Sequence, residues 1–483
     1  MDDAVRDEIL WLQFFVKSLQ QDVATLSHAV QDRDRQIHKL QEENRLLRQR
    51  LSEQQPSSAP SSSSGPPPFI KAAVAKHRCK QPGRKAGHEA DLRPPPKVDC
   101  TVEVPLPNNA DGCPACPHCQ GVLRKFKRHQ RLVEDLVPAH VRVTRYRTRS
   151  GYCPRCRQRV ESRHPEQPPA ADVPHGQVGL NTLATVAVLR LVNRLPFRQI
   201  TQVLADLSGL RLCAGAVAKQ IQRLGAWLGG EYEQLKCRLR ASTAVHADET
   251  HWRTAGHNRW LWTVCDPRHT LYHVDESRGG KVIRGLLGSA FGGTLVSDFY
   301  SAYNTVDCPQ QKCLAHLLTE LKETANRSPP FARGRFYRRC RRLAKDLLHH
   351  KTRWDELDDT TYTRLGHRLE QRLGNLAAEH LRDKDADTRR LAGRLSRHSD
   401  QLTVFLWQRE IDGTNNAAER ALRPIVVSRK ISGGSRSAVG ANSTAVVASV
   451  LRSARQQGRD VLETLRQLLI NCWADKPPGL MLN

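Results

Sequence analysis

The sequence predicts an α/β protein in which four strands build one central sheet. Three segments, AVHADETHW, RWLWTVCD and TLYHVDES, are rich in β-branched and aromatic residues and are separated by turn-forming segments. RGGKVIRGLL then has the pattern of a helix, and GGTLVSDFY has that of another strand. The expected order is therefore three strands, a helix and a fourth strand.

This order is typical of a ribonuclease-H-like sheet, in which the first and fourth strands are neighbours. Asp248 lies in the first of these strands and Asp298 ends the fourth. Neighbouring strands would bring both carboxylates within reach of one metal ion. Glu249 is expected on the opposite face, because successive residues of a strand alternate.

A third acid, Glu419 in NNAAERALRP, lies about one turn into a predicted helix that Asn415 or Asn416 is able to cap. Pro424 should end this helix early, because it cannot donate a helical hydrogen bond. Basic residues that follow Glu419 are expected to face a phosphate backbone. They are Arg420, Arg423, Arg429 and Lys430.

Three carboxylates in one place suit phosphoryl transfer with two divalent ions, because Mg²⁺ prefers hard oxygen ligands. Asp248 is expected to bridge two Mg²⁺ (or Mn²⁺) ions, with Asp298 and Glu419 each holding one. A solvated or ion-paired role is the simpler interpretation of any single acid. The three together favour catalysis.

The charge of the chain indicates a polyanionic partner. Lys and Arg number 76 against 49 Asp and Glu, a formal charge of +27, and neutralised phosphates release counterions. Double-stranded DNA is the expected partner, and an anionic membrane surface is the weaker alternative. No segment approaches the roughly 18 apolar residues of a membrane span, and the N-terminus is acidic, so we expect a cytoplasmic, nucleoid-associated protein without membrane contact.

A heptad pattern predicts a coiled coil over residues 1–53, and hence a homodimer or higher oligomer. β-branched residues dominate the a positions and Leu the d positions, while Asn44 is a polar a residue that fixes the register. An amphipathic helix packed on its own chain is the alternative. Residues 54–99 are predicted to be a disordered Pro/Ser-rich spacer followed by a basic arm, which either becomes ordered on DNA or stays a solvated linker.

Residues 100–165 are predicted to form a zinc-binding module. Two CxxC knuckles, each followed by polar or basic residues, suit one structural Zn²⁺ held by four thiolates. The segment between the knuckles alternates apolar and basic residues and is expected to form strands. Cys113 also stands ahead of the first knuckle, so the first pair is ambiguous. The preferred ligands are Cys116, Cys119, Cys153 and Cys156.

Residues 175–240 are predicted to form three short helices that resemble a helix-turn-helix, with Gly209 as a helix stop. Lys219 and Arg223, with Gln220 beside them, would then lie near a DNA groove. A small helical bundle without DNA contact is the alternative.

Residues 317–410 are rich in Leu, Arg, Ala and Glu and are predicted to be helical. Within them FARGRFYRRCRRLAK places seven Lys or Arg in fifteen residues without an acid. This run predicts a helix face laid along a DNA backbone, with a solvated face as the alternative. The isolated cysteines elsewhere are expected to be buried core thiols. They are Cys213, Cys237, Cys265, Cys340 and Cys472.

Nearly the whole chain resembles the insertion-sequence-66 family of DDE transposases. The resemblance rests on GRKAGHE, the CxxC pairs, HADET, SDFYSAY followed by CLAH, and NNAAERALRPIVVSRK. It implies that Asp248, Asp298 and Glu419 are the metal-binding triad and that residues 317–410 are inserted into a core formed by 241–316 and 411–475, with 476–483 as a tail.

The CLAH motif implies that His316, next to Cys313, lies near the active site as a structural or DNA-contacting residue. A second zinc site there is a weaker alternative. The chain departs from the family pattern at Gly413 and Thr414, where an apolar residue and Asp usually precede the Asn pair, so the local turn is in question.

The predicted function is that of a bacterial transposase that cleaves element ends and joins the 3′-hydroxyls to target DNA, with element-encoded helper proteins as further candidate partners. Two alternatives use the same sequence features. One is a structure-specific nuclease that cleaves without joining, and the other is a catalytically inactive, zinc-containing DNA-binding protein.

Overall fold

The computed structural model describes residues 139–162 and 178–474 without a gap. It also describes 97–103, 106–108, 112–116, 118–119, 121–124, 132, 164–169, 476–478 and scattered positions from 20 to 46. The chain forms two compact units, Met1–Leu132 and Val133–Asn483. The core positions of the predicted coiled coil, and residues 54–96 of the predicted spacer and arm, lie outside the described residues. No helix within the described residues is long and apolar enough to cross a membrane.

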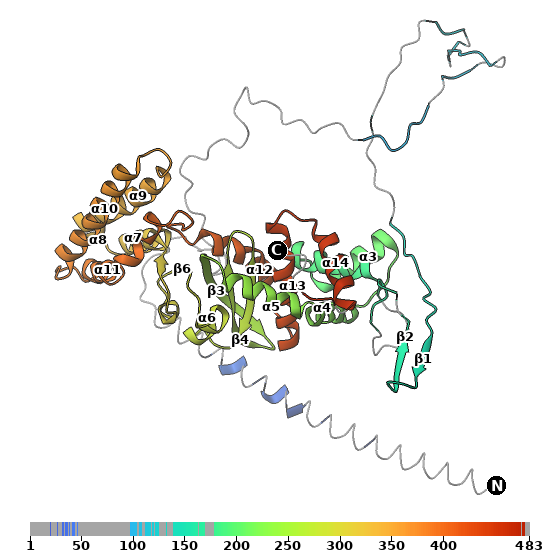
Figure 1. Cartoon of the computed structure of the whole chain (residues 1–483), viewed down its shortest axis with the longest axis horizontal. Coiled ribbons are helices and arrows are strands. Elements are labelled where there is room, and N and C mark those ends of the chain that lie inside the picture. Colours follow the sequence, from blue (N-terminus) through green and yellow to red (C-terminus); the bar gives the residue numbers. More distant parts are fainter. Residues whose placement is uncertain are drawn as a thin grey trace. The chain divides into compact units, whose positions relative to one another are not determined.

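A mixed five-stranded sheet forms the centre of the second unit (Figure 1). The strand order is β5-β4-β3-β6-β7, in which β3 pairs antiparallel with β4 and parallel with β6. The predicted order of strands and helix, and the pairing of the first and fourth strands, are thus confirmed. The elements are β3 (Ala244–Thr254), β4 (His257–Cys265), β5 (Thr270–Asp275), α6 (Gly280–Leu287), β6 (Thr294–Ser297) and β7 (Gln310–Lys312).

Strand β7 was not predicted. Its three residues, Gln310, Gln311 and Lys312, are polar and yet buried, so they carry none of the apolar signal of an inner strand. Gln310 Nε2 donates to the carbonyls of Tyr303 and Val306, and Gln311 Oε1 accepts from Phe405 N–H at 3.0 Å. These hydrogen bonds satisfy the polar side chains and make this strand compatible with burial.

Helices cover both faces of the sheet. Trp252, Leu261 and Tyr272 pack against two long helices near the C-terminus, α12 (Asn416–Ser432) and α13 (Ala438–Gln456). The opposite face packs against α6 and the helices that precede the sheet. The helices that precede the sheet are α2 (Leu180–Ala187), the π-helical turn η1 (Val188–Val192), α3 (Phe197–Ser208), α4 (Ala214–Trp227) and α5 (Gly229–Arg240). The last helix of the chain, α14 (Val461–Trp473), packs into the same core.

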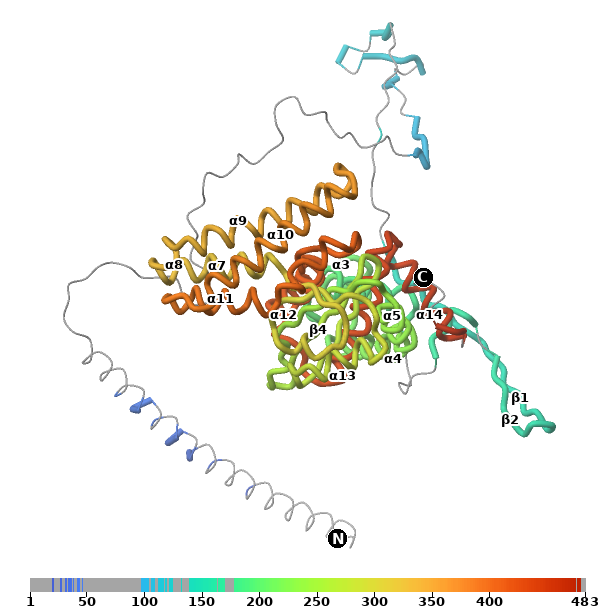
Figure 2. The backbone as a smooth tube through the Cα atoms, turned by 60° about the vertical axis from the view of Figure 1, so that its left-hand side comes forward, coloured from blue at the N-terminus to red at the C-terminus, as the bar shows by residue number. Residues whose placement is uncertain are grey.

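Residues between β7 and α12 form a helical insertion with its own apolar core (Figure 2). That core continues onto the sheet through Val296 of β6. Asp358 and Asp385 cap two of its helices through hydrogen bonds to Thr361 and Thr388 N–H. The helices are α7 (Leu314–Arg327), α8 (Pro329–Arg333), α9 (Arg335–Thr352), α10 (Asp359–His380) and α11 (Ala386–Arg397). Short 3₁₀ turns, η2 (Ser301–Thr305), η3 (Asp400–Leu402) and η4 (Val404–Leu406), join the core elements.

The prediction that Pro424 ends its helix is wrong, because α12 continues through Pro424 to Ser432. Leu422 and Ile425, on either side of the proline, are buried against the sheet. Burial of two such side chains contributes about 3–6 kcal/mol, which offsets the cost of about 3 kcal/mol for an interior proline. Tyr272 Oη also donates to the carbonyl of Ala421 at 2.6 Å.

The structure corrects two further predictions. Residues 139–149 contain no strand, and the antiparallel pair β1 (Ser150–Cys153) and β2 (Gln158–Glu161) begins only at the second CxxC knuckle. Cys213 and Cys237 are exposed rather than buried; Cys213 precedes α4 as its N-cap, and its sulfur accepts from Ala216 N–H. Cys265 and Cys340 are buried as expected.

Candidate active site

Two parallel strands place Asp248 and Asp298 at the same level of the sheet. His246 of β3 stands opposite Val296 of β6, and each aspartate follows two residues later. Adjacent strands lie about 4.8 Å apart, so the two aspartates stand on neighbouring chain segments, and the Asp298 carboxylate acts on the pKa of Asp248. The structure thereby brings together the first two acids of the predicted triad.

Asp248 lies in an environment that disfavours its charge. Burial, together with the neighbouring carboxylates of Glu249 and Asp298, raises the pKa of Asp248 to about 7. Glu249 N–H donates to Asp248 Oδ1 at 2.8 Å, and this hydrogen bond lowers the pKa of Asp248. A divalent cation at this carboxylate would relieve the same unfavourable interactions.

Glu249 occupies the other face of the sheet, as strand alternation predicts. Its carboxylate accepts two hydrogen bonds from Arg278, at 2.9 and 2.7 Å, and one from Tyr303 Oη. With both oxygens held by these partners, Glu249 is a structural acid.

Asn415 fixes the start of α12 against β3. Its side-chain amide donates to Ala247 O at 2.8 Å, and its Oδ1 lies 3.2 Å from His246 Nδ1. Its backbone N–H donates to Cys313 Sγ at 3.0 Å. Asn415 makes no side-chain capping bond to α12, so the predicted capping role is wrong for this residue. The buried side chain instead sets where Glu419, one turn later, stands relative to Asp248.

His316 interacts electrostatically with Glu419 and with both aspartates. Its Nδ1 is 3.7 Å from Glu419 Oε1. A hydrogen bond with Cys313 raises the pKa of His316 to about 9, and the carboxylates of Asp298 and Glu419 add to this effect. His316 is also one of the charges that act on Asp248. His316 is therefore a cationic neighbour that all three acids have in common.

Within the described part of the chain, three potential metal-ligand atoms lie within 4.8 Å of one another at Cys313, His316 and Glu419. The carboxylates of the predicted triad do not meet this limit together. The Cys313 side chain is fully buried and already bonded to Asn415 N–H and His316. A sulfur and imidazole set suits softer transition metals, whereas Mg²⁺ requires carboxylate oxygens.

Lys312 is a buried cation next to this site that the sequence gave no reason to select. Its Nζ donates to Ser297 Oγ at 3.1 Å, beside Asp298. Burial lowers the pKa of Lys312 to about 8, and the Asp298 carboxylate opposes that shift. A polar residue in a three-residue strand offers no pattern by which to recognise it.

The basic residues around Glu419 separate into two groups. Arg420, Arg423 and Lys430 are exposed. Arg429 is half-buried, and its guanidinium donates to Thr250 Oγ1 at 3.0 Å and to His251 O. Arg429 therefore also joins α12 to β3.

Helix α4 carries the predicted groove-facing residues but packs closely on α13. A Cβ at Gly225 would lie 2.5 Å from Ser443 Cβ, so the two helices are in direct contact. Lys219 is exposed, whereas Arg223 is half-buried and donates to Gln220 Oε1 at 3.4 Å. Gln220 is buried, so the prediction that it faces a groove is wrong in this packing.

The cysteine pairs lie in different units, with Cys116 and Cys119 in the first and Cys153 and Cys156 in the second. The pKa of Cys116 is lowered, chiefly by the backbone N–H of His118, and that of Cys153 chiefly by the N–H of Cys156. A lowered pKa favours the thiolate, which is the form that binds zinc. Cys113 is exposed in the first unit.

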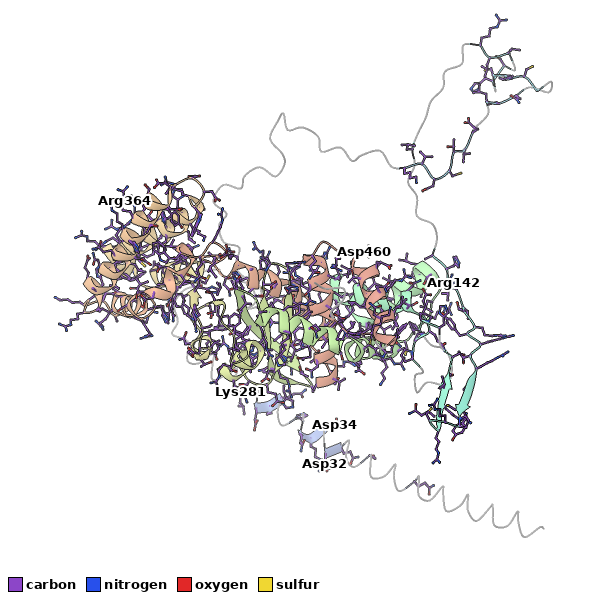
Figure 3. All side chains as sticks on the ribbon, viewed as in Figure 1. Asp32, Asp34, Arg142, Lys281, Arg364 and Asp460 are labelled. Atoms are coloured by element: carbon purple, nitrogen blue, oxygen red, sulfur yellow. The ribbon has the colours of Figure 1, made fainter. Side chains whose placement is uncertain are left out.

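Helix α9 presents a surface, here called the α9 basic face, that carries only positive charge. Within the described residues, none of its side chains has an acidic partner within 4 Å. On the flank next to α10, by contrast, Arg339 pairs with Glu379, and Asp346 pairs with Arg372 at 2.9 Å. Figure 3 shows Arg364 of α10 on the same insertion. The exposed residues of the α9 basic face are Arg335, Arg338, Arg341, Arg342 and Lys345.

Comparison with known proteins identifies the chain's relatives. It is 27% identical over 426 residues to the uncharacterized protein y4qI of Sinorhizobium fredii (strain NBRC 101917 / NGR234), covering 81% of this chain and 74% of that protein. It is 25% identical over 388 residues to the uncharacterized protein y4jD of the same organism, covering 74% of each. Residues 175–443 match the model of the transposase IS66 family. Because this match spans more than half of the chain and includes Asp248, Asp298 and Glu419, the protein belongs to the transposase IS66 family.

Proposed function

We propose that the protein is a DDE transposase that cuts DNA at the ends of its element and joins the 3′-hydroxyls to target DNA. The observation that carries the proposal is the meeting of Asp248 and Asp298 at one sheet edge, with Glu419 linked to them through His316. The strand order supports a ribonuclease-H-like core interrupted by the helical insertion.

The three carboxylates fit divalent metal ions. They offer oxygen ligands, and the raised pKa of Asp248 marks a buried acid that lacks a compensating cation. Bound Mg²⁺ would activate the attacking oxygen and stabilise the leaving oxygen of the phosphodiester. Asp248 and Asp298 would be metal ligands, and the contacts of Asn415 with β3 would orient Glu419 towards the same metal ions.

Several charged surfaces support binding to double-stranded DNA. Arg420, Arg423 and Lys430 are exposed on the same helix as Glu419, and the α9 basic face is free of acids. A DNA backbone would neutralise these charges and release counterions. His316 and Lys219, at the active site and on α4, are further candidate contacts, while the half-buried Arg223 and Arg429 would act mainly by holding their helices.

The cysteine knuckles and the N-terminal heptads would have structural roles in this transposase. The four cysteines of the two knuckles would be ligands of structural Zn²⁺, since the lowered pKa values of Cys116 and Cys153 support thiolate ligands. The heptads of residues 1–53 would join two or more copies, so that one assembly holds both element ends.

The test is a cleavage and strand-transfer assay on a labelled duplex that carries the element's terminal repeat, with Mg²⁺ or with chelator. We expect Mg²⁺-dependent cleavage and joining that disappear in Asp298→Asn and Glu419→Gln. Asp307→Asn, which removes an exposed carboxylate on the loop before β7, is the matched control and should keep both activities.

Each alternative function has its own outcome in this assay. Cleavage without joining of a pre-nicked end would identify a nuclease. Tight DNA binding without cleavage by the unmodified protein would identify an inactive DNA-binding protein. Activity that survives Asp298→Asn would contradict the assigned site.

A further inference from the structure

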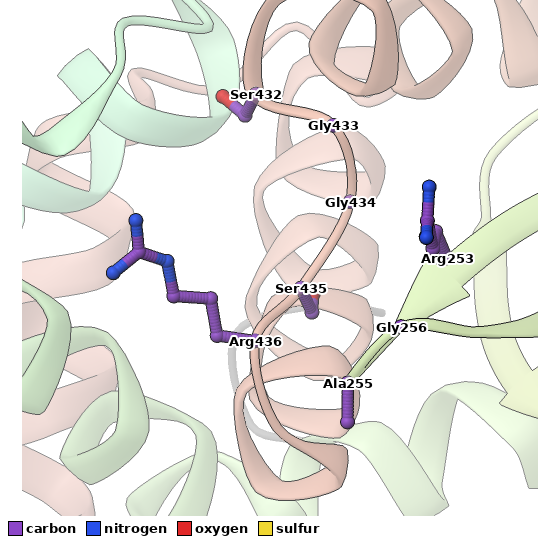
Figure 4. Close-up of a pocket in the computed structure, with 8 residues that line it drawn as sticks. All are labelled: Arg253, Ala255, Gly256, Ser432, Gly433, Gly434, Ser435 and Arg436. Atoms are coloured by element: carbon purple, nitrogen blue, oxygen red, sulfur yellow. The ribbon is translucent and has the colours of Figure 1, made fainter. Parts of the chain in front are cut away.

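A cavity of about 390 Å³ lies between the tip of the β3–β4 hairpin and the turn that joins α12 to α13 (Figure 4). The hairpin contributes Arg253, Ala255 and Gly256, and the turn contributes residues 432–436 (SGGSR). Arg253 and Arg436 are exposed, and no acid lines the cavity. The charge of this wall is therefore entirely positive.

The hairpin and the turn form one rigid frame. Ser435 N–H donates to Arg253 O at 2.8 Å, and Ala255 N–H donates to Ser435 O at 3.0 Å. Gly434 has a φ of 106°, and a Cβ there would lie 2.2 Å from Arg253 O. Only glycine permits this close approach, so the cavity is preformed.

Two serine hydroxyls of the turn are set to donate hydrogen bonds. Ser432 Oγ accepts from Arg190 Nη1 at 2.9 Å, and Ser435 Oγ accepts from Trp252 Nε1 at 3.2 Å. Neither hydroxyl donates to a protein atom in the described part of the chain. Because each oxygen already accepts from a buried donor, its own proton is available to an acceptor in the cavity.

Arg190 places a buried positive charge behind Ser432, with the Phe197 ring 4.6 Å from its guanidinium and no carboxylate partner within the described residues. Its side chain bonds only to neutral oxygens, Leu195 O at 3.0 Å and Ser432 Oγ, and is 4% exposed. Within the described residues no carboxylate lies within 4 Å of it, and its Nε has no partner. A buried charge without a counterion is unfavourable, so an anion near Ser432 would be stabilised.

We propose that this cavity binds a phosphate group of the DNA backbone, a contact that rests on the proposed function and adds a second anchor to the active site. Arg253 and Arg436 flank the turn (Figure 4) and would supply charge, while the two serines would donate to phosphate oxygens. Arg253 stands five residues beyond Asp248, about 17 Å along an extended strand. One duplex can span both places.

The first measurement is the salt dependence of binding to the terminal-repeat duplex by fluorescence anisotropy. Arg253→Gln with Arg436→Gln should make the slope of log Kobs against log salt shallower by about 0.9, the effect of one lost phosphate contact. The matched control is Lys281→Gln with Arg284→Gln. It removes two exposed charges from α6, on the opposite side of the sheet, and should keep the slope (Figure 3).

The second measurement uses inorganic phosphate alone, followed by the ³¹P line width in the full-length protein. The variant with Arg253→Gln and Arg436→Gln, here called the cavity variant, should lose the broadening of the phosphate ³¹P line that the unmodified and control proteins produce. Loss of broadening with an unchanged DNA slope would overturn the DNA assignment in favour of a free phosphate ligand. If the cavity variant keeps both the DNA slope and the broadening of the unmodified protein, the cavity is not a phosphate site. The same conclusion follows if its DNA slope becomes shallower while the broadening stays complete.

The strand-transfer assay separates this inference from the proposed function. If the unmodified protein cleaves and joins DNA but the cavity variant matches its control in binding, only the cavity proposal fails. If phosphate binds at the cavity and the unmodified protein shows no cleavage, only the proposed function fails.

Discussion

Neutralising the α9 basic face should weaken DNA binding in a way that depends strongly on salt. Arg338, Arg342 and Lys345 follow one another at spacings of four and three residues, so they share one side of α9 over about 10 Å. All three are exposed, and none has an acidic partner within the described residues. Their substitution by Gln should therefore remove phosphate contacts without loss of an internal ion pair.

The size of the effect follows from counterion release. Each lost phosphate contact makes the slope of log Kobs against log salt shallower by about 0.9, so three contacts change it by about 2.7. Raising salt from about 50 to about 200 mM should then cost the unmodified protein about 40-fold more affinity than the variant. Anisotropy titrations of a labelled duplex over this range measure the difference directly.

The helical insertion provides a control with the same change in net charge. Arg339, Arg372 and Arg409 are also on its surface, but they pair with Glu379, Asp346 and Asp355. Replacing these three arginines by Gln should leave the slope close to that of the unmodified protein. Equal slopes for the two triple variants, or an unchanged slope for the face variant, would refute the assignment of DNA to this helix face.

Two further predictions concern stability and metal content. Because the pKa of Asp248 is raised to about 7 in the folded protein, stability falls as pH rises above about 4, the pKa in the unfolded chain, and the full cost is reached above about 7. In chelator, Asp248→Asn should raise the free energy of unfolding by up to about 4 kcal/mol above pH 7, and the gain should shrink as pH falls towards about 4; equal denaturant midpoints at pH 8 would contradict this. Cys116→Ser with Cys153→Ser should remove one zinc per chain by atomic emission, whereas Cys213→Ser with Cys237→Ser should not, and retained zinc would refute the knuckle assignment.

Periodicity and turn signals predicted the elements that carry their own pattern. The strands around Asp248, helix α6 and the stop at Gly209 all have local causes, and Gly209 adopts the left-handed conformation expected at such a stop, with a φ of 73°. The failures occur where distant contacts override local preference. Pro424 remains helical because both flanking turns are buried, and β7 pairs because polar side chains find buried partners.

In the candidate active site, too, some features were predictable from the sequence and others were not. HADET, SDFYSAY and NNAAER marked the three acids, because carboxylates at strand ends and at a helix start are visible in a sequence. The contacts that connect them were not visible. The Asn415 side chain binds β3 and makes no capping bond to its own helix, and His316 lies 3.7 Å from Glu419 and also interacts with the aspartates.

By itself, the sequence determined the family, the order of strands and helices, and the positions of the acids, since these depend on neighbouring residues along the chain. Within the described residues, the tertiary structure was needed to show which arginines remain without acidic partners, which serine hydroxyls line a cavity and which polar residues form the buried edge strand β7. Those properties depend on side chains that are more than a hundred residues apart in some cases, such as Arg190 and Ser432. Folding brings them together, and no local pattern encodes which of their hydrogen-bonding groups are left free.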